Sequence, residues 1–287
     1  MILVTGATGN VGRELVRELD ARGARQRLLV RDPVRAAGLP ERAERVVGDL
    51  GLPESLPPAF AGVDTLFLLT QGIGVELAAN ALRAAKAVGV RRVVFMSSIN
   101  VLGDPVPAMG RWHHAREQLV RDAGLPATIL RPGGFMTNAF EWAPSIREAG
   151  FVFDPIGPGR YALIDPADVA AVAARVLTED GHDGQAYVLT GDEVLTVAEQ
   201  VRILARALGR DIEVREAASP EDAVRSRFPQ GAPPALAEAI LDTFTRMRSD
   251  RVGVRTDTVE RLLGRKPRPF ADWCARHAQS FLRPTSR

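Results

Sequence analysis

The first pattern in the chain that could do chemistry is a glycine-rich turn, Gly6-Ala-Thr-Gly9-Asn-Val-Gly12. It lies between a short apolar run and an amphipathic stretch, the context in which this spacing predicts a dinucleotide site. Gly6 permits a tight turn, Gly9 lets the backbone approach a pyrophosphate, and Gly12 lets the following helix pack closely on the strand. Free N–H groups at the positive end of that helix would bind the phosphates. A structural turn without a ligand is the alternative.

Charged residues follow the next two apolar runs, where a dinucleotide's adenosine half would lie. A carboxylate at the end of the second strand favours NAD, whereas an arginine favours the 2′-phosphate of NADP. The chain has both, as Arg31-Asp32, with Arg35 one helical turn further on. We interpret Arg31 as the phosphate partner, and a solvated Arg–Asp pair capping the next helix is the alternative. Asp49 either meets the adenine amino group or caps residues 50–56.

These groups require a sheet that brings strand ends together. Six short apolar runs in the first half predict buried strands of a parallel sheet: Ile2–Thr5, Arg27–Val30, Arg45–Val47, Thr65–Leu69, Val93–Met96 and Thr128–Leu130. Helical patterns at about 10–22, 75–88 and 105–123 alternate with them. This alternation indicates an α/β fold with a doubly wound parallel sheet of the Rossmann type.

The second half is less regular and predicts a smaller, mostly helical substrate lobe. Residues 150–160 indicate a loop or short strand, followed by a helix at 166–178, a strand at 185–189 and a helix at 196–208. Residues 216–287 look mostly helical, with breaks at prolines that include Pro229. We therefore expect a dinucleotide-binding core of residues 1–133 plus about 162–190. The substrate-binding lobe would comprise about 134–161 and 191–287.

Composition narrows the classes of function. The chain has 287 residues, 46% of them hydrophobic, which is enough for a sizeable core. Its net charge of +2 and scattered arginines argue against a nucleic-acid partner. The single cysteine, Cys274, excludes an intrachain disulfide and a cysteine-based zinc site, and is compatible with a reducing cytoplasm. No apolar run is long enough to predict a membrane span or a signal peptide. We expect a cytoplasmic protein without a metal, and the oligomeric state is left open.

Several segments together resemble the NmrA-like group of the atypical short-chain dehydrogenase/reductases. They appear in the family's order and cover nearly the whole chain: GATGNVGR at 6–13, LVRDP at 29–33, VVGDL at 46–50, VVFMSSINVLG at 93–103, GLPATILRPGGFMTN at 124–138, IDPADVAAVAARVL at 164–177 and FADWCARHAQSFL at 270–282. The group includes quinone reductases, triphenylmethane-dye reductases, polyketide-tailoring ketoreductases and non-catalytic NADP sensors. The resemblance implies NADP(H) as the cofactor but does not by itself settle activity.

The resemblance also shows what this chain lacks. Orthodox members of the superfamily use a Tyr-x-x-x-Lys pair, in which tyrosine protonates the nascent alkoxide, and no such pair exists here. By the family's spacing the tyrosine position falls on Met109 and the lysine position on His113. The catalytic serine of the family matches Ser98. We expect Ser98 and His113 to be the catalytic residues. A strand-end serine bonding the backbone, and a histidine that contacts only the cofactor ribose, are the alternatives.

The missing acid constrains the substrate. Reduction of an isolated ketone forms an alkoxide whose conjugate acid has a pKa of order 15.7, whereas a quinone forms a phenolate-like anion near about 10. We therefore expect an NADPH-dependent oxidoreductase acting on a planar, electron-poor carbonyl, either a quinone or a hydroxy-aromatic or polyketide ketone. A non-catalytic NADP-sensing regulatory protein is the main alternative, and isomerase or dehydratase chemistry is a further one.

Two sets of residues complete these predictions. An apolar wall for a small aromatic substrate is expected from residues that follow the sixth strand, unless they only pack in the core: Phe135, Met136, Phe140 and Trp142. The cofactor is expected to contact Gly6, Thr8, Gly9, Asn10, Val11, Gly12, Arg31, Asp49, Leu50, Thr70, Ser97, Pro132 and Gly133.

Overall fold

The computed structural model describes residues 1–228, 230–249 and 253–282. The predicted helix break at Pro229 lies outside the described residues. The chain forms two compact units. Unit 1 comprises Met1–Val101, Gly110–Pro132 and Pro166–Leu189, and unit 2 comprises Leu102–Met109, Gly133–Asp165 and Thr190–Arg287.

Unit 1 is built on a seven-stranded sheet in the order β3-β2-β1-β4-β5-β6-β9, with every neighbouring pair parallel. The strand order reverses direction between β1 and β4, which confirms the predicted doubly wound Rossmann-type sheet. In such sheets ligands bind outside the carboxyl ends of the strands at this switch point. The strands are β1 (Ile2–Val4), β2 (Gln26–Val30), β3 (Glu44–Val47), β4 (Thr65–Leu68), β5 (Arg92–Met96), β6 (Ala127–Pro132) and β9 (Ala186–Leu189).

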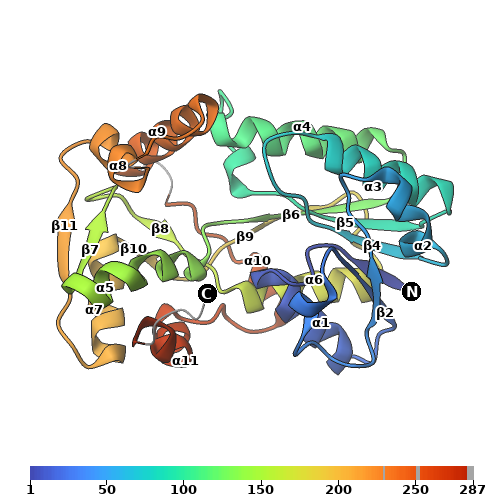
Figure 1. Cartoon of the computed structure of the whole chain (residues 1–287), viewed down its shortest axis with the longest axis horizontal. Helices are drawn as coiled ribbons and strands as arrows, with labels where there is room; N and C mark the ends of the chain where they lie inside the picture. The colour runs from blue at the N-terminus through green and yellow to red at the C-terminus, as the bar shows by residue number, and fades with distance from the viewer. Residues whose placement is uncertain (229, 250–252, 283–287) are drawn as a thin grey trace. The chain divides into compact units, whose positions relative to one another are not determined.

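Helices cover both faces of this sheet, with α1 and α6 on one face and α2, α3 and α4 on the other (Figure 1). Apolar residues of α1 recur at helical spacing and are buried: Val11, Leu15, Val16 and Leu19. The helices of unit 1 are α1 (Asn10–Ala21), α2 (Leu56–Phe60), α3 (Glu76–Ala87), α4 (Ala108–Asp122) and α6 (Pro166–Thr178), and the 3-10 helices are η1 (Pro33–Ala36), η2 (Pro53–Ser55) and η3 (Ile99–Val101).

Unit 2 is mostly helical and has its own apolar core, in which Trp273, Phe270 and Phe281 are fully buried. Two small sheets accompany the helices, a parallel pair of β7 and β11 and an antiparallel pair of β8 and β10. Its elements are η4 (Met136–Trp142), α5 (Ala143–Ala149), β7 (Phe151–Asp154), β8 (Tyr161–Ala162), β10 (Val194–Leu195), α7 (Val197–Leu208), β11 (Glu213–Glu216), α8 (Pro220–Arg227), α9 (Pro234–Arg248), α10 (Thr258–Leu263) and α11 (Phe270–Leu282). None of the helices in the described ranges is long and apolar enough to cross a membrane.

The two units differ from the expected domain boundaries in two segments, and Gly133 and Thr190, which were expected in the core, also belong to unit 2. Residues 162–165 belong to unit 2 because Ile164 exchanges backbone hydrogen bonds with Gly134 and Met136. Residues 102–109 also belong to unit 2, where the backbone N–H of Ala108 donates to Asp242 of α9 at 3.0 Å. The predicted helix at 105–123 begins only at Ala108, because Pro105 and Pro107 precede it.

Candidate dinucleotide site and catalytic residues

The glycine-rich turn has the geometry that phosphate binding requires. Gly6 adopts φ +66°, a conformation that favours glycine. A Cβ on Gly12 would lie 2.0 Å from the carbonyl oxygen of Gly6, so this position permits the close approach of α1. Gly9, the N-cap of α1, is exposed, and a Cβ there would meet only the Gly6 oxygen, at 3.4 Å. The space beyond Gly9 is therefore open to a ligand at the N-terminus of the helix.

Other residues of the predicted cofactor set surround this turn in unit 1. Asn10 is exposed, Thr8 is half-buried, and the side chain of Val11 belongs to the core. The Thr5 hydroxyl, which the sequence analysis did not single out, accepts from the N–H of Leu69 at 2.8 Å. This bond joins the end of β1 to the end of β4 and so holds the turn beside the next strand.

The loop after β2 carries two guanidinium groups that have no partner among the residues described by the structure. Arg31 and Arg35 are both exposed, and neither side chain forms an ion pair or hydrogen bond with another described residue. The Asp32 carboxylate accepts from the N–H of Val34 at 2.9 Å and caps η1. Asp32 is thus engaged as a cap, as the alternative interpretation expected of it, while Arg31 stays available for an anion.

Replacing Arg31 by alanine is expected to weaken NADPH binding about tenfold or more and to leave NADH binding little changed. A lost charge-assisted contact to the 2′-phosphate costs about 1.5–3 kcal/mol, and NADH lacks that phosphate. Calorimetric titration of both cofactors checks this. Arg35→Ala is the matched variant, and a selective loss in Arg35→Ala alone would move the phosphate contact to Arg35.

The predicted residues after β3 and β4 differ in how they are used. The Asp49 carboxylate accepts from the N–H of Gly51 at 2.8 Å, so one of its oxygens caps the following turn. Leu50 is buried, and its carbonyl accepts from Asn80 at 2.9 Å. The Thr70 hydroxyl oxygen is buried and has no hydrogen-bond partner among the described residues. A buried hydroxyl without a partner carries a desolvation cost, so Thr70 fits a position that a bound ligand completes.

A buried arginine fixes the loop that contains Thr70. Arg116 of α4 is only 2% exposed and donates to the backbone carbonyls of Gly72 and Gly74. Burial lowers the pKa of Arg116, but a guanidinium stays protonated in proteins. Its positive charge therefore remains beside the helix turn that carries His113.

Ser97, which was predicted to contact the cofactor, is part of a buried hydrogen-bonded ion network. Glu117 of α4 accepts from the Ser97 hydroxyl at 2.6 Å and from both Nε and Nη2 of Arg131, at 2.9 and 2.6 Å. Burial alone would raise the pKa of Glu117, but hydrogen bonds from Arg131 and Ser97 outweigh it and lower that pKa. The Ser97 hydroxyl thus donates internally, and the network ties β5 and β6 to α4. A cofactor could still meet Ser97 through the acceptor side of its hydroxyl.

The next residue, Ser98, is half-buried at the carboxyl end of β5, and its oxygen accepts from the N–H of Asn100 at 3.2 Å. Its own O–H donates to no described residue, so it can donate to a ligand. The local backbone bond that the alternative expected is present, and it leaves this donor free.

His113 is held neutral by its surroundings. Its Nδ1 is buried without a partner among the described residues. Burial, followed by the charge of Arg116, lowers the pKa of His113 from 6.5 to about 4. At pH 7 about one ring in a thousand is protonated. His113 can therefore accept or donate a hydrogen bond as a neutral ring, but it is a poor source of a proton.

The predicted substrate wall lies in unit 2, where Met136, Phe140 and Trp142 pack in or against the core. Met136 is 1% exposed. The Phe140 ring lies 5.0 Å from the ring of Trp273 and 5.5 Å from that of Phe281. For Met136 and Phe140 the structure favours the packing role that the sequence left open. Phe135 and Trp142, at the two ends of η4, are half-buried. Pro132 ends β6 and Gly133 follows it.

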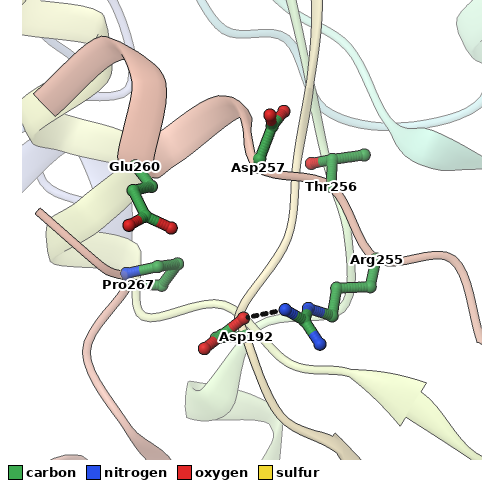
Figure 2. A pocket seen from close by; sticks show the side chains of 6 residues that line it. All are labelled: Asp192, Arg255, Thr256, Asp257, Glu260 and Pro267. Carbon is green, nitrogen blue, oxygen red and sulfur yellow. Dashed lines mark ion pairs between the residues drawn. The ribbon is translucent and has the colours of Figure 1, made fainter. Parts of the chain in front are cut away.

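A separate cavity of about 360 Å³ in unit 2 contains none of the predicted residues. Figure 2 shows its lining, in which Asp192 forms an ion pair with Arg255 at 2.8 Å. Asp192 also pairs with Lys266 at 3.4 Å. Besides Asp192 and Arg255, the cavity is lined by Thr256, Asp257, Glu260 and Pro267. Within the described ranges no cluster of His, Cys, Asp and Glu is arranged to hold a metal ion.

Comparison with known proteins agrees with this geometry. A family model described as NAD(P)H-binding matches residues 6–180. The chain is 42% identical to a (4-alkanoyl-5-oxo-2,5-dihydrofuran-3-yl)methyl phosphate reductase of Streptomyces griseus, over 98% of this chain and 99% of that protein. It is 37% identical to an NAD(P)H azoreductase of Xenophilus azovorans, over 98% and 99% of the two chains. The crystal structure of an NADPH-dependent quinone oxidoreductase of Escherichia coli with NADPH superposes with a TM-score of 0.82 at 28% identity, covering 96% of this chain and 99% of that one.

Proposed function

The chain belongs to the NAD(P)H-binding family and to the NmrA-like group of atypical short-chain dehydrogenase/reductases, and from this premise we propose that it is an NADPH-dependent reductase of planar, electron-poor acceptors. NADPH supplies the hydride when bound. The open backbone at Gly9 receives the pyrophosphate, Arg31 receives the 2′-phosphate, and the unpartnered Thr70 hydroxyl gains a partner. Ser98 donates its free O–H to the acceptor.

The observation that carries the proposal is the chemistry of α4. Where the orthodox enzymes have a tyrosine acid, this helix has Met109, which is half-buried and packs with the core of unit 2. One turn further on is His113, whose pKa is lowered to about 4 by burial and by Arg116. Neither side chain is a proton donor at neutral pH. The anion left by hydride transfer must therefore be stable enough to exist without a strong acid beside it.

Acceptor chemistry decides which anions meet this condition. The conjugate acid of a phenolate-like product has a pKa about 6 units below that of an alkoxide, which corresponds to about 8 kcal/mol. This difference is as large as the lower end of the barrier reductions that enzymes achieve. Quinones delocalise the charge, and hydroxy-aromatic ketones supply the proton from their own hydroxyl. Isolated aliphatic ketones do neither.

The relatives' substrates support this acceptor class. Their names specify a dihydrofuranone with an alkanoyl group, an azo compound and a quinone. Each of these can spread the added negative charge over a conjugated system. We infer the same electronic requirement for this chain, with a quinone or a hydroxy-aromatic or polyketide ketone as the substrate.

The proposal is tested by following NADPH oxidation at 340 nm with a panel of acceptors at equal concentration. The panel comprises benzoquinones, naphthoquinones, hydroxy-aromatic ketones, and aliphatic ketones as the control class. We expect turnover with the first three classes only. If NADPH binds tightly in a parallel titration but no acceptor is reduced, the result supports the NADP-sensing alternative and contradicts the reductase.

A further inference from the structure

Arg13 ties the glycine-rich turn to the loop after β2. From the first turns of α1 its Nε donates to the carbonyl of Thr8 at 3.1 Å. On the same guanidinium, Nη2 donates to the carbonyl of Arg35 at 2.5 Å and Nη1 to that of Ala37 at 3.3 Å. One side chain therefore spans the two segments that receive the pyrophosphate and the 2′-phosphate in the proposed function.

The position of Arg13 is unfavourable for a cation unless it has a specific role. The positive end of a helix dipole opposes a positive charge near the N-terminus. All three partners of Arg13 are neutral carbonyls, and no carboxylate pairs with it in the described part of the chain. Arg17, four residues further on the same helix, instead pairs with Glu14 at 2.6 Å. The charge of Arg13 is thus left uncompensated next to an anion-binding turn.

The loop that Arg13 holds has little packing of its own. Val34, in the middle of η1, is 78% exposed, and Ala36 is the one buried residue of that short helix. Arg31 and Arg35 are exposed on either side. Among the side-chain hydrogen bonds of the described residues, those to the carbonyls of Arg35 and Ala37 directly connect this loop to the helix that begins at the glycine-rich turn.

We propose that Arg13 is a positioning residue for cofactor selectivity, which holds the Arg31–Ala37 loop so that its free guanidinium groups meet the 2′-phosphate of NADPH. This inference rests on the NADPH preference in the proposed function. Its consequence is specific, because NADH lacks the 2′-phosphate that the guanidinium groups of this loop would bind. Loss of Arg13 should lower affinity for NADPH far more than affinity for NADH.

The test compares Arg13→Met, Arg13→Lys and the matched surface variant Arg17→Met by calorimetric titration with NADPH and NADH. Arg13→Met keeps most of the stem and removes every donor, so we expect NADPH affinity to fall about tenfold and NADH affinity less than threefold. Arg13→Lys keeps the charge but cannot reach all three carbonyls, so it should not restore NADPH affinity. Arg17→Met should bind both cofactors like the unaltered protein.

A double variant separates positioning from direct charge. If Arg13 acts through Arg31, its removal has little further effect once Arg31 is gone. Adding Arg13→Met to Arg31→Ala should then weaken NADPH binding by less than a further threefold. Equal losses for both cofactors, full rescue by lysine, or additive losses would each overturn the positioning role. The unaltered protein's preference is read in the same titrations. If the unaltered protein binds NADPH and NADH with nearly equal affinity, the proposed NADPH specificity is overturned as well. If it strongly prefers NADPH and Arg13→Met leaves that preference unchanged, only the role of Arg13 is overturned.

Discussion

Replacing Gly9 by valine is expected to abolish dinucleotide binding and leave the protein folded. Gly9 has φ −83° and ψ 178°, an extended conformation that valine adopts readily. Its Cβ would meet only the Gly6 oxygen at 3.4 Å, so the branched side chain would point into the open space that the pyrophosphate needs. Losing two backbone hydrogen bonds to a charged phosphate costs about 3–6 kcal/mol, or about 10²–10⁴-fold in affinity.

Gly12→Val is the contrasting variant. There the new Cβ would lie 2.0 Å from the Gly6 oxygen and 2.8 Å from Cα of Ala7, so backbone must move and the unfolding temperature should fall sharply. Titration calorimetry and thermal unfolding on both variants measure the two effects separately. A Gly9→Val protein that binds NADPH with undiminished affinity would show that the phosphates lie elsewhere.

The parts of the fold that were predicted correctly are those encoded locally. Most strands of unit 1 are short apolar runs, and α1 has its apolar residues at helical spacing, so both are recognisable within a few residues. The prediction of a buried strand at Arg45–Val47 was right about the strand but wrong about its burial, because β3 lies at the edge of the sheet and is mostly exposed. The strand β11 was missed because its sequence, Glu213-Val-Arg-Glu216, is mostly charged and exposed. It forms by parallel pairing with Phe151–Asp154, about sixty residues earlier in the chain, and nothing local specifies that pairing.

In the candidate site, the glycine-rich turn and Arg31 were predicted from spacing and strand ends, and their roles toward a cofactor stay predictions. Ser97 was predicted to contact the cofactor, and the sequence analysis did not foresee that its hydroxyl bonds to Glu117, twenty residues away. A signal for this network was available, since Arg131 is a charged residue in an apolar strand and therefore needs a buried partner. The sequence also contained a signal for Arg13, because a cation in the first turns of a helix is unfavourable unless it has a specific partner.

The source of the proton decides how the rate of the reaction depends on pH. A histidine acid with an ordinary pKa near 6.5 would make the rate fall as pH rises through 6.5, because only the protonated ring donates. Burial and Arg116 lower the pKa of His113 to about 4, so its protonated fraction is already negligible above pH 6. We therefore expect kcat on a quinone to show no titration near pH 6.5. His113→Gln should lower kcat less than about tenfold, not the 10²–10⁴-fold of a lost general acid.

The larger losses should come from Ser98 and from the substrate itself. Ser98 has a free O–H, so Ser98→Ala removes a donor to the developing anion and should cost about 10²–10³-fold in kcat, as for a lost oxyanion donor. Methylating the hydroxyl of a hydroxy-aromatic ketone removes the internal proton and should lower kcat by at least as much.

Stopped-flow measurement of hydride transfer, with NADPH affinity determined alongside, separates chemistry from binding. A loss of about 10³-fold in His113→Gln with NADPH affinity intact would instead make His113 the acid. Full activity on isolated aliphatic ketones would equally contradict the mechanism, because their alkoxide has neither charge delocalisation nor an internal donor.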